Sequence, residues 1–189
     1  MVFSMKKKLT KNQLLKRASK IKLLLTDVDG VFTDTGVYYS EQGELMKRFS
    51  IRDGMGVERL RKLVNVETGI ITREKTLIVK TRAQKLKIDE LHMGVYEKEK
   101  TLEKILLRKN LKPEEIAFIG DDTNDIEILK SVGLSACPID ATKFAKDVVD
   151  LIVESKGGYG AFRDFAEIII EAKTKKKLYR KDDDEIKQS

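Results

Sequence analysis

The stretch LLLTDVDGVFTD, residues 23–34, decides how the chain folds and where it acts. Its first four residues predict a short buried strand, which ends directly in Asp27 and Asp29. Two carboxylates at the end of an apolar strand repel each other and are costly to desolvate, so a fold keeps such a pair where a cation or a reaction needs it. A charged Asp-Gly turn that merely closes the strand is the alternative. Residues two apart on an extended chain point to the same side, so we expect both carboxylates on one side.

Short apolar runs alternate with amphipathic stretches along the rest of the chain. Residues 37–51 predict two extended arms around a turn at Gln42 and Gly43, and Gly54 and Gly56 are expected to open the helix that follows. The remaining strands are expected at residues 68–72, 89–94, 114–120, 133–139 and 150–155, and the remaining helices at 75–87, 98–110, 141–149 and 161–172. This alternation predicts an α/β fold, a Rossmann-like parallel sheet with helices on both faces.

The length of 189 residues suits one domain. We expect a charged helical lead-in at residues 1–20, the α/β domain at residues 21–171 and a charged C-terminal tail at residues 172–189.

The composition excludes several classes of function. The net charge of +7 comes largely from basic residues near the two ends, without the interleaved aromatics that nucleic-acid binding would need. No apolar run approaches the ~20 residues of a membrane span, and no apolar stretch follows the basic residues near the start as it would in a signal peptide. The single cysteine, Cys137, allows no internal disulfide, which favours the reducing cytoplasm. We therefore expect a cytoplasmic protein that binds neither nucleic acid nor membranes.

Three further strand ends carry polar residues. The strand at 68–72 ends in Thr72, the loop after the strand at 89–94 reaches Lys98, and the strand at 114–120 ends in Asp121 and Asp122, with Asp125 one helical turn further on. In a parallel sheet all of these lie on the rim where ligands bind. Converging carboxylates predict a hard cation such as Mg²⁺, and a lysine and a hydroxyl beside them predict a phosphate. The expected chemistry is phosphoryl transfer.

Each residue of this rim then has an expected role. Asp27 is the candidate nucleophile, because a carboxylate can carry a phosphoryl group as an acyl phosphate that water later cleaves. Asp29 is the candidate general acid and base. Asp121 is expected to complete the metal site that Asp27 and Asp29 begin, with Asp122 and Asp125 in support. Lys98 is expected to screen the two anions that react, and Thr72 to donate to a phosphoryl oxygen.

These residues resemble a known family. DVDGVFTD, IIT, the lysine of GVYEK and GDDTND match, in order, the four motifs of the haloacid dehalogenase superfamily of aspartate-nucleophile phosphatases. The chain is most similar to the cap-less branch that acts on 3-deoxy-2-keto sugar acid phosphates, from about Lys22 to Ile170. The resemblance implies that Asp27 is the nucleophile, that Asp29 is the acid/base and lends Mg²⁺ its backbone carbonyl, and that Asp121 is the remaining protein ligand.

The resemblance leaves the substrate open between two groups. Arg52, Asp53 and Gly54 keep a pattern of the phosphatases of the eight-carbon 3-deoxy-D-manno-octulosonate (KDO) 8-phosphate. Glu74, with Arg82 and Lys85, is more similar to phosphatases of the nine-carbon KDN or sialic acid 9-phosphates, although Glu74 could instead be an ordinary acid in the first turn of a helix. If these three residues lie along one helix face, a nine-carbon acid is predicted to be turned over at least as well as KDO 8-phosphate.

The short insertions leave no room for a lid domain, so either the substrate is a macromolecule or another subunit covers the rim. The resemblance implies a homotetramer in which hairpins form a barrel and neighbouring chains complete each site. Two rivals remain: a receiver domain of a signalling relay, and a non-catalytic regulatory relative of the same superfamily. The DxDG and GDDxxD patterns argue against the first, and the complete set of motif residues against the second. A phosphatase for another small phosphomonoester is a further alternative.

Overall fold

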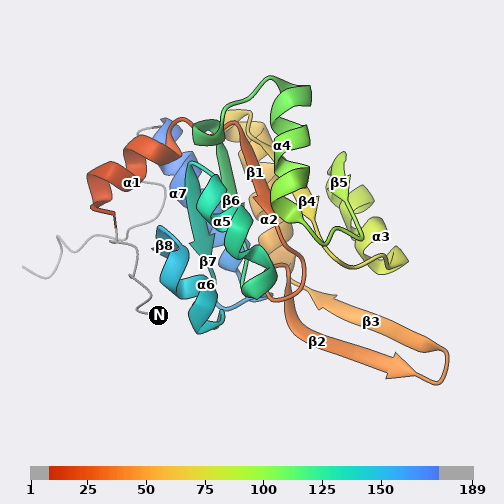
Figure 1. Cartoon of the computed structure of the whole chain (residues 1–189). Coiled ribbons are helices and arrows are strands. Elements are labelled where there is room, and N and C mark those ends of the chain that lie inside the picture. The colour runs from red at the N-terminus through yellow and green to blue at the C-terminus, as the bar shows by residue number, and fades with distance from the viewer. Residues whose placement is uncertain (1–8, 175–189) are drawn as a thin grey trace, which may run out of the picture.

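A six-stranded parallel sheet forms the centre of the computed structural model, which describes residues 9–174 (Figure 1). The strand order is β5-β4-β1-β6-β7-β8, and every neighbouring pair is parallel. The strands are β1 (Leu23–Thr26), β4 (Glu67–Ile71), β5 (Glu90–His92), β6 (Ile116–Ile119), β7 (Leu134–Cys137) and β8 (Leu151–Ile152). The predicted α/β fold with a parallel sheet is confirmed.

Helices cover both faces of the sheet because its strands are apolar on both sides. Leu24 of β1 packs into one core with helices α1 (Lys11–Ala18), α2 (Ile51–Val64), α3 (Leu77–Leu86) and α7 (Ala161–Thr174). Leu23 and Leu25 pack into the other core with α4 (Lys98–Lys109), α5 (Ile126–Ser131) and α6 (Lys143–Val148). Two short 3₁₀ helices, η1 (Pro113–Glu115) and η2 (Thr123–Asp125), flank β6. The described helices include none that is both long and apolar enough to cross a membrane.

The register of the central strands brings the expected site residues to one rim. Thr26 at the end of β1 pairs with Ile70 of β4 and Ile119 of β6. The Asp27 N–H extends this ladder, since it donates to the Ile119 carbonyl at 3.0 Å. The chain then bends at Val28 and turns at Asp29, so this segment is not extended as expected, and the placement of both carboxylates on one side stays a prediction.

A hairpin projects from the body of the protein (Figure 1). It consists of β2 (Thr33–Ser40) and β3 (Gly43–Phe49), which pair in the antiparallel sense as the two predicted arms. Its large exposed apolar side chains are Val37, Tyr38, Tyr39, Leu45 and Met46. Within residues 9–174 this hairpin is the only insertion between β1 and α2, and no cap domain covers the rim.

Two helix starts differ from the sequence prediction. Helix α2 begins at Ile51, because the Ser50 hydroxyl accepts from the N–H groups of Arg52 and Asp53 and caps the helix there. Gly54 therefore lies inside α2. Helix α3 begins at Leu77 behind the N-cap Thr76, so Glu74 lies in the preceding loop and not on the helix.

The expected division of the chain stays a prediction. Part of the lead-in, residues 1–8, and most of the tail, residues 175–189, lie outside the described residues. Helix α7 continues to Thr174, slightly past the expected boundary at residue 171.

Candidate active site

Three carboxylates meet around one buried lysine at the carboxyl ends of β1 and β6. One oxygen each of Asp27, Asp121 and Asp125 lies within 4.8 Å of the others. Lys98, the first residue of α4, places its ammonium 2.9 Å from Asp27 Oδ2 and 2.6 Å from Asp125 Oδ1. Lys98 and Asp125 are fully buried and Asp27 is 5% exposed. The strand-end residues that the sequence placed on one rim are thus brought together.

The charges in this cluster are unbalanced. Burial and repulsion from Asp125 raise the pKa of Asp27 to about 7, although Lys98 opposes the shift. Burial and the neighbouring Asp27 and Asp125 carboxylates raise the pKa of Asp121 to about 8. Burial lowers the pKa of Lys98, but the attraction of Asp27 and Asp125 outweighs it and keeps that pKa above its usual value. One ammonium does not neutralise three carboxylates, so the set fits a hard divalent cation with oxygen ligands.

Local backbone geometry holds the cluster in place. The Asp125 carboxylate accepts from the Asp121 N–H at 3.0 Å and from the Asp122 N–H at 3.4 Å, so the GDDTND turn folds around it. Gly30 has φ +80°, and a Cβ there would lie 2.0 Å from Asp121 Oδ2. Only glycine combines this conformation with this approach. The Asp122 carboxylate is exposed, accepts from the Thr123 N–H and caps η2, outside the group of three.

Asp29 faces a different partner from Asp27. Its two carboxylate oxygens each lie 2.8 Å from the ammonium of Lys47 in β3, and Oδ1 also accepts from the Thr33 hydroxyl at 3.2 Å. The Lys47 side chain is 1% exposed and the Asp29 side chain 31% exposed. Lys47 therefore lies behind Asp29, on the side away from solvent.

Thr72 follows β4 directly and is 1% exposed. Its N–H donates to the His92 carbonyl, and its hydroxyl oxygen accepts from the Glu74 N–H at 3.1 Å. The hydroxyl proton is therefore free for another acceptor, at the end of the strand that neighbours β1.

Two of the expected substrate residues, Asp53 and Gly54, serve the packing of helices. The buried Asp53 carboxylate accepts from the N–H groups of Gly160 at 3.2 Å and Arg163 at 3.0 Å, at the start of α7. A Cβ at Gly54 would lie 2.7 Å from the guanidinium of Arg82. Arg52 is exposed on α2.

Of the other expected substrate residues, Glu74 lies in the loop before α3, and Arg82 and Lys85 lie on that helix. The Arg82 guanidinium donates to the Ser50 carbonyl at 2.9 Å and lies over the Phe49 ring. Lys85 is exposed on α3. Glu74 lies near the hairpin base, with Oε2 3.9 Å from the Lys47 ammonium.

The KGGYG loop before α7 packs against the loop that carries the aspartates. The Gly158 N–H donates to the Val31 carbonyl at 2.8 Å, and a Cβ at Gly157 would lie 2.0 Å from the Gly30 carbonyl oxygen. Arg48 joins this loop to the hairpin, since its guanidinium bonds both Asp34 and the Gly158 carbonyl. The loop is thus a helix entry that braces the site of its own chain.

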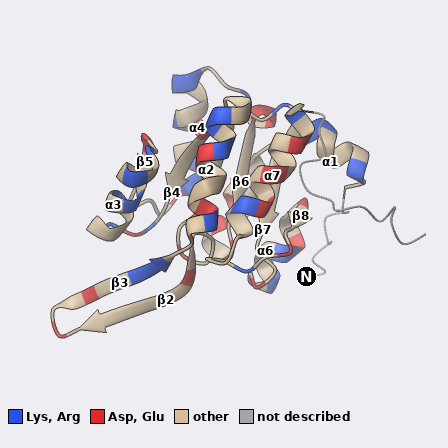
Figure 2. Cartoon of the chain, turned by 180° about the vertical axis from the view of Figure 1, so that it is seen from behind, with Lys and Arg blue, Asp and Glu red and all other residues tan. Residues whose placement is uncertain are grey.

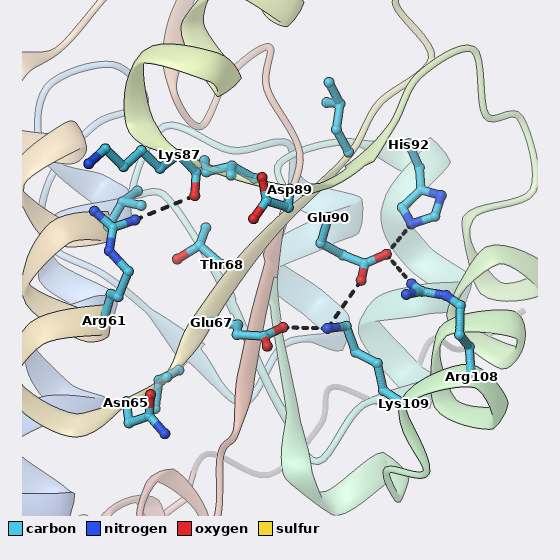
Figure 3. A pocket seen from close by; sticks show the side chains of 14 residues that line it. Arg61, Asn65, Glu67, Thr68, Lys87, Asp89, Glu90, His92, Arg108 and Lys109 are labelled. Carbon is cyan, nitrogen blue, oxygen red and sulfur yellow. Dashed lines mark hydrogen bonds and ion pairs between the residues drawn. The ribbon is translucent and has the colours of Figure 1, made fainter.

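A separate cavity of about 590 Å³ lies at the amino end of β4, the opposite end from the carboxylate cluster. Figure 3 shows that five of its polar side chains face one another, namely Glu67, Glu90, His92, Arg108 and Lys109. Glu90 binds Arg108, His92 and Lys109, and Lys109 also binds Glu67. This network neutralises itself, which favours the carboxyl-end rim as the site of chemistry.

Lys47 is the functional candidate that the sequence analysis missed. Nothing in GELMKRF distinguishes a buried lysine from an exposed one. The hairpin geometry offered a signal, because β2 starts four residues after Asp29 and β3 must return to the same place. Thr33 pairs with Phe49 and Val37 with Lys47, so the returning strand ends beside Asp29.

Comparison with known proteins agrees with this geometry. Residues 57–161 match the family model of haloacid dehalogenase-like hydrolases. The chain is 34% identical over 164 residues to the 3-deoxy-D-manno-octulosonate 8-phosphate phosphatase KdsC of Yersinia pestis. The aligned region covers 87% of each of the two chains.

Solved structures give the same result. One is the 3-deoxy-D-manno-octulosonate 8-phosphate phosphatase from Moraxella catarrhalis, in complex with magnesium ion, phosphate ion and KDO. It has a TM-score of 0.83 and 29% identity over 86% of this chain and 93% of that one. The cobalt-bound phosphatase from Haemophilus influenzae has a TM-score of 0.81 and 32% identity over 84% and 92% of the two chains. The chain belongs to the family of haloacid dehalogenase-like hydrolases.

Proposed function

We propose that this hydrolase is a magnesium-dependent phosphatase that cleaves the phosphate monoester of a 3-deoxy-2-keto sugar acid, and that KDO 8-phosphate is its substrate. The observation that carries the proposal is the buried Lys98 ammonium between Asp27 and Asp125, with Asp121 completing the carboxylate group. Asp27, Asp121 and the backbone carbonyl of Asp29 would hold Mg²⁺, which when bound offsets the negative charge of the phosphate.

In the first step an oxygen of the Asp27 carboxylate attacks phosphorus and forms an acyl phosphate. The bond between phosphorus and the sugar oxygen breaks, and Asp29 supplies the proton that the leaving alcohol needs. Lys98 reduces the repulsion between Asp27 and the incoming phosphate, because its ammonium already lies 2.9 Å from the nucleophile. Thr72 donates its free hydroxyl proton to a phosphoryl oxygen.

In the second step water attacks the phosphorus of the acyl phosphate. Asp29, now ionised, takes a proton from the water, and the bond between phosphorus and Asp27 breaks. Inorganic phosphate leaves, and both aspartates return to their starting state. Asp125 takes no proton in this scheme; it positions Lys98 and the backbone of residues 121 and 122.

The choice of an eight-carbon acid rests on the relatives, which are named for KDO 8-phosphate. The nine-carbon alternative, a KDN or sialic acid 9-phosphate, stays a prediction. It drew on a shared helix face for Glu74, Arg82 and Lys85, and that arrangement lacks support because Arg82 binds the Ser50 carbonyl within its own chain. Only Glu74, near Lys47, remains a candidate contact with the chain hydroxyls of a longer acid.

The functional unit in this proposal is a cytoplasmic homo-oligomer, a tetramer as the family resemblance implies. The projecting hairpin exposes Tyr38, Tyr39, Leu45 and Met46, which a partner hairpin would cover. The rim has no cap domain of its own among residues 9–174, so a neighbouring chain would complete it.

A phosphate-release screen tests the proposal. The chain is incubated with KDO 8-phosphate, KDN 9-phosphate, sialic acid 9-phosphate and ordinary hexose phosphates, with and without Mg²⁺. The proposal expects magnesium-dependent release with the highest kcat/KM for KDO 8-phosphate. A higher kcat/KM for hexose phosphates would contradict the substrate class, and equal release after chelation would contradict the metal.

A further inference from the structure

We propose that Lys47 is a positioning residue, which holds the Asp29 side chain in place for proton transfer from its protonated carboxyl group to the leaving alcohol. The inference rests on the proposed phosphatase function. Its starting point is the pair of 2.8 Å contacts between the Lys47 ammonium and the two oxygens of Asp29.

Burial separates this role from substrate binding. The Lys47 side chain is 1% exposed, whereas the Asp29 side chain is 31% exposed and reaches the rim. A substrate can therefore meet Asp29, but it cannot reach the Lys47 ammonium without displacing Asp29. Lys47 acts through Asp29.

The surroundings of Lys47 favour this single task. Its ammonium is 3.9 Å from both Glu44 and Glu74, beyond hydrogen-bonding distance, and it bonds both oxygens of Asp29. Among the described residues Asp29 has one further side-chain hydrogen bond, with the Thr33 hydroxyl at 3.2 Å. Thr33 begins β2 and Lys47 lies in β3, so both groups that hold Asp29 come from the base of the hairpin. The Lys and Arg residues of β3 lie at the end of the strand next to the body (Figure 2).

Without Lys47 the partly exposed Asp29 side chain loses its charged anchor and samples other rotamers. A displacement of about 1 Å at a reacting group can slow a reaction about 100-fold. The loss should fall on the step in which Asp29 protonates an alkoxide leaving group. It should spare a leaving group that departs as a stable anion and needs no proton.

The test compares two esters, KDO 8-phosphate and p-nitrophenyl phosphate, in the full-length, magnesium-loaded chain. For Lys47→Met we expect kcat/KM to fall about 10- to 100-fold on KDO 8-phosphate, part of the 10²–10⁴-fold that general acid–base catalysis supplies. On p-nitrophenyl phosphate kcat/KM should change less than about threefold. Lys47→Arg, which can also bind a carboxylate with two hydrogen bonds, should recover part of the loss.

Two further variants test whether the loss of activity is specific to the contacts that hold Asp29. Lys62→Met removes a lysine from an exposed ion pair with Glu58 and should change neither kcat/KM. Thr33→Val keeps the side-chain volume and removes the other hydrogen bond to Asp29, so it should show the same selective loss on KDO 8-phosphate. If Lys47→Met does not fold, Thr33→Val and Lys47→Arg still test the role of the hairpin base.

The outcomes separate the two proposals. An equal loss on both esters, or no loss on KDO 8-phosphate, would overturn the role of Lys47 and leave the phosphatase standing. A wild-type chain that releases phosphate from neither ester would overturn the proposed function and the role of Lys47 with it.

Discussion

At the scale of single residues, two lysines form ion pairs with three acidic residues of the site. Lys98 forms ion pairs with Asp27 and Asp125, and Lys47 forms an ion pair with Asp29. Each ammonium is buried, where an unpaired charge would be strongly destabilising. The proposed nucleophile and the proposed acid/base are thus held by separate lysines on separate elements, so each can be disturbed without the other.

The variant Asp27→Asn is expected to lower kcat at least about 1,000-fold, because an amide cannot form the acyl phosphate. Lys98 keeps its bond to Asp125, so the fold should remain. Phosphate release and circular dichroism measure the two effects. Turnover within tenfold of wild type, in protein free of deamidation, would contradict a covalent mechanism through Asp27.

Magnesium is expected to stabilise the folded chain, because it relieves the repulsion among Asp27, Asp121 and Asp125. At about 100 Kd of Mg²⁺ the rise in Tm should be about 5–10 °C for a chain of this size. Asp121→Asn should remove most of the rise. The matched control is Asp122→Asn, whose side chain only caps η2 and can still do so as an amide, and it should keep the rise. Loss of the rise in the control alone would place the metal elsewhere.

At the scale of elements, Asp53 joins two helices. Both of its oxygens accept backbone N–H groups at the start of α7, although Asp53 itself belongs to α2. Burial raises the pKa of Asp53 to about 6 in spite of these bonds. The folded chain therefore binds this proton more tightly than the unfolded chain does.

This difference predicts a pH dependence of stability. Between about pH 4 and pH 6 the unfolded chain ionises Asp53 while the folded chain still holds the proton, so the free energy of unfolding falls as pH rises through this window. Asp53→Asn cannot ionise and should lack this contribution. Urea unfolding of both proteins at several pH values measures it. A difference in stability that stays constant from pH 4 to pH 7 would show that Asp53 titrates normally.

The elements show what the sequence could and could not predict. Apolar runs such as LLLT, buried on both faces, predicted the strands and the rim correctly, because local pattern and strand-end chemistry suffice for both. The substrate residues were harder to assign. Asp53 bonds residues more than 100 positions away in the chain, and Arg82 reaches back to Ser50, so their partners depend on how distant elements pack. Lys47 was missed for a different reason, because its local sequence does not distinguish a buried lysine from an exposed one, although the hairpin geometry offered a signal.

At the scale of the whole molecule, the hairpin connects the surface of the chain to its chemistry. Its outer part exposes Tyr39 and Leu45, and its base holds Asp29 through Lys47. Contacts made by the outer part should therefore influence how firmly Asp29 is held.

The double variant Tyr39→Glu with Leu45→Glu is expected to yield a monomer, because four or more like charges would meet where apolar side chains are proposed to pack. Its kcat/KM on KDO 8-phosphate should fall at least about tenfold as the open rim loses its neighbour. Light scattering and phosphate release measure the two effects. The control Leu107→Glu alters an exposed apolar residue on α4 and should leave the mass in solution unchanged. A fully active monomer would refute the need for a neighbouring chain.

The strand order also affects the chain while it is being synthesised. β1 is made before the other five strands of the described sheet, yet it lies between β4 and β6 and meets its second neighbour only when Ile116–Ile119 has been added. At ordinary rates of translation the edge of β1 that pairs with β6 stays unpaired for roughly 5–20 s. The aspartate loop waits longer, because Gly157 and Gly158 brace it from near the other end of the chain. A nascent chain thus holds Asp27, the proposed nucleophile, early but gains a braced aspartate loop only after Gly157 and Gly158 have been added.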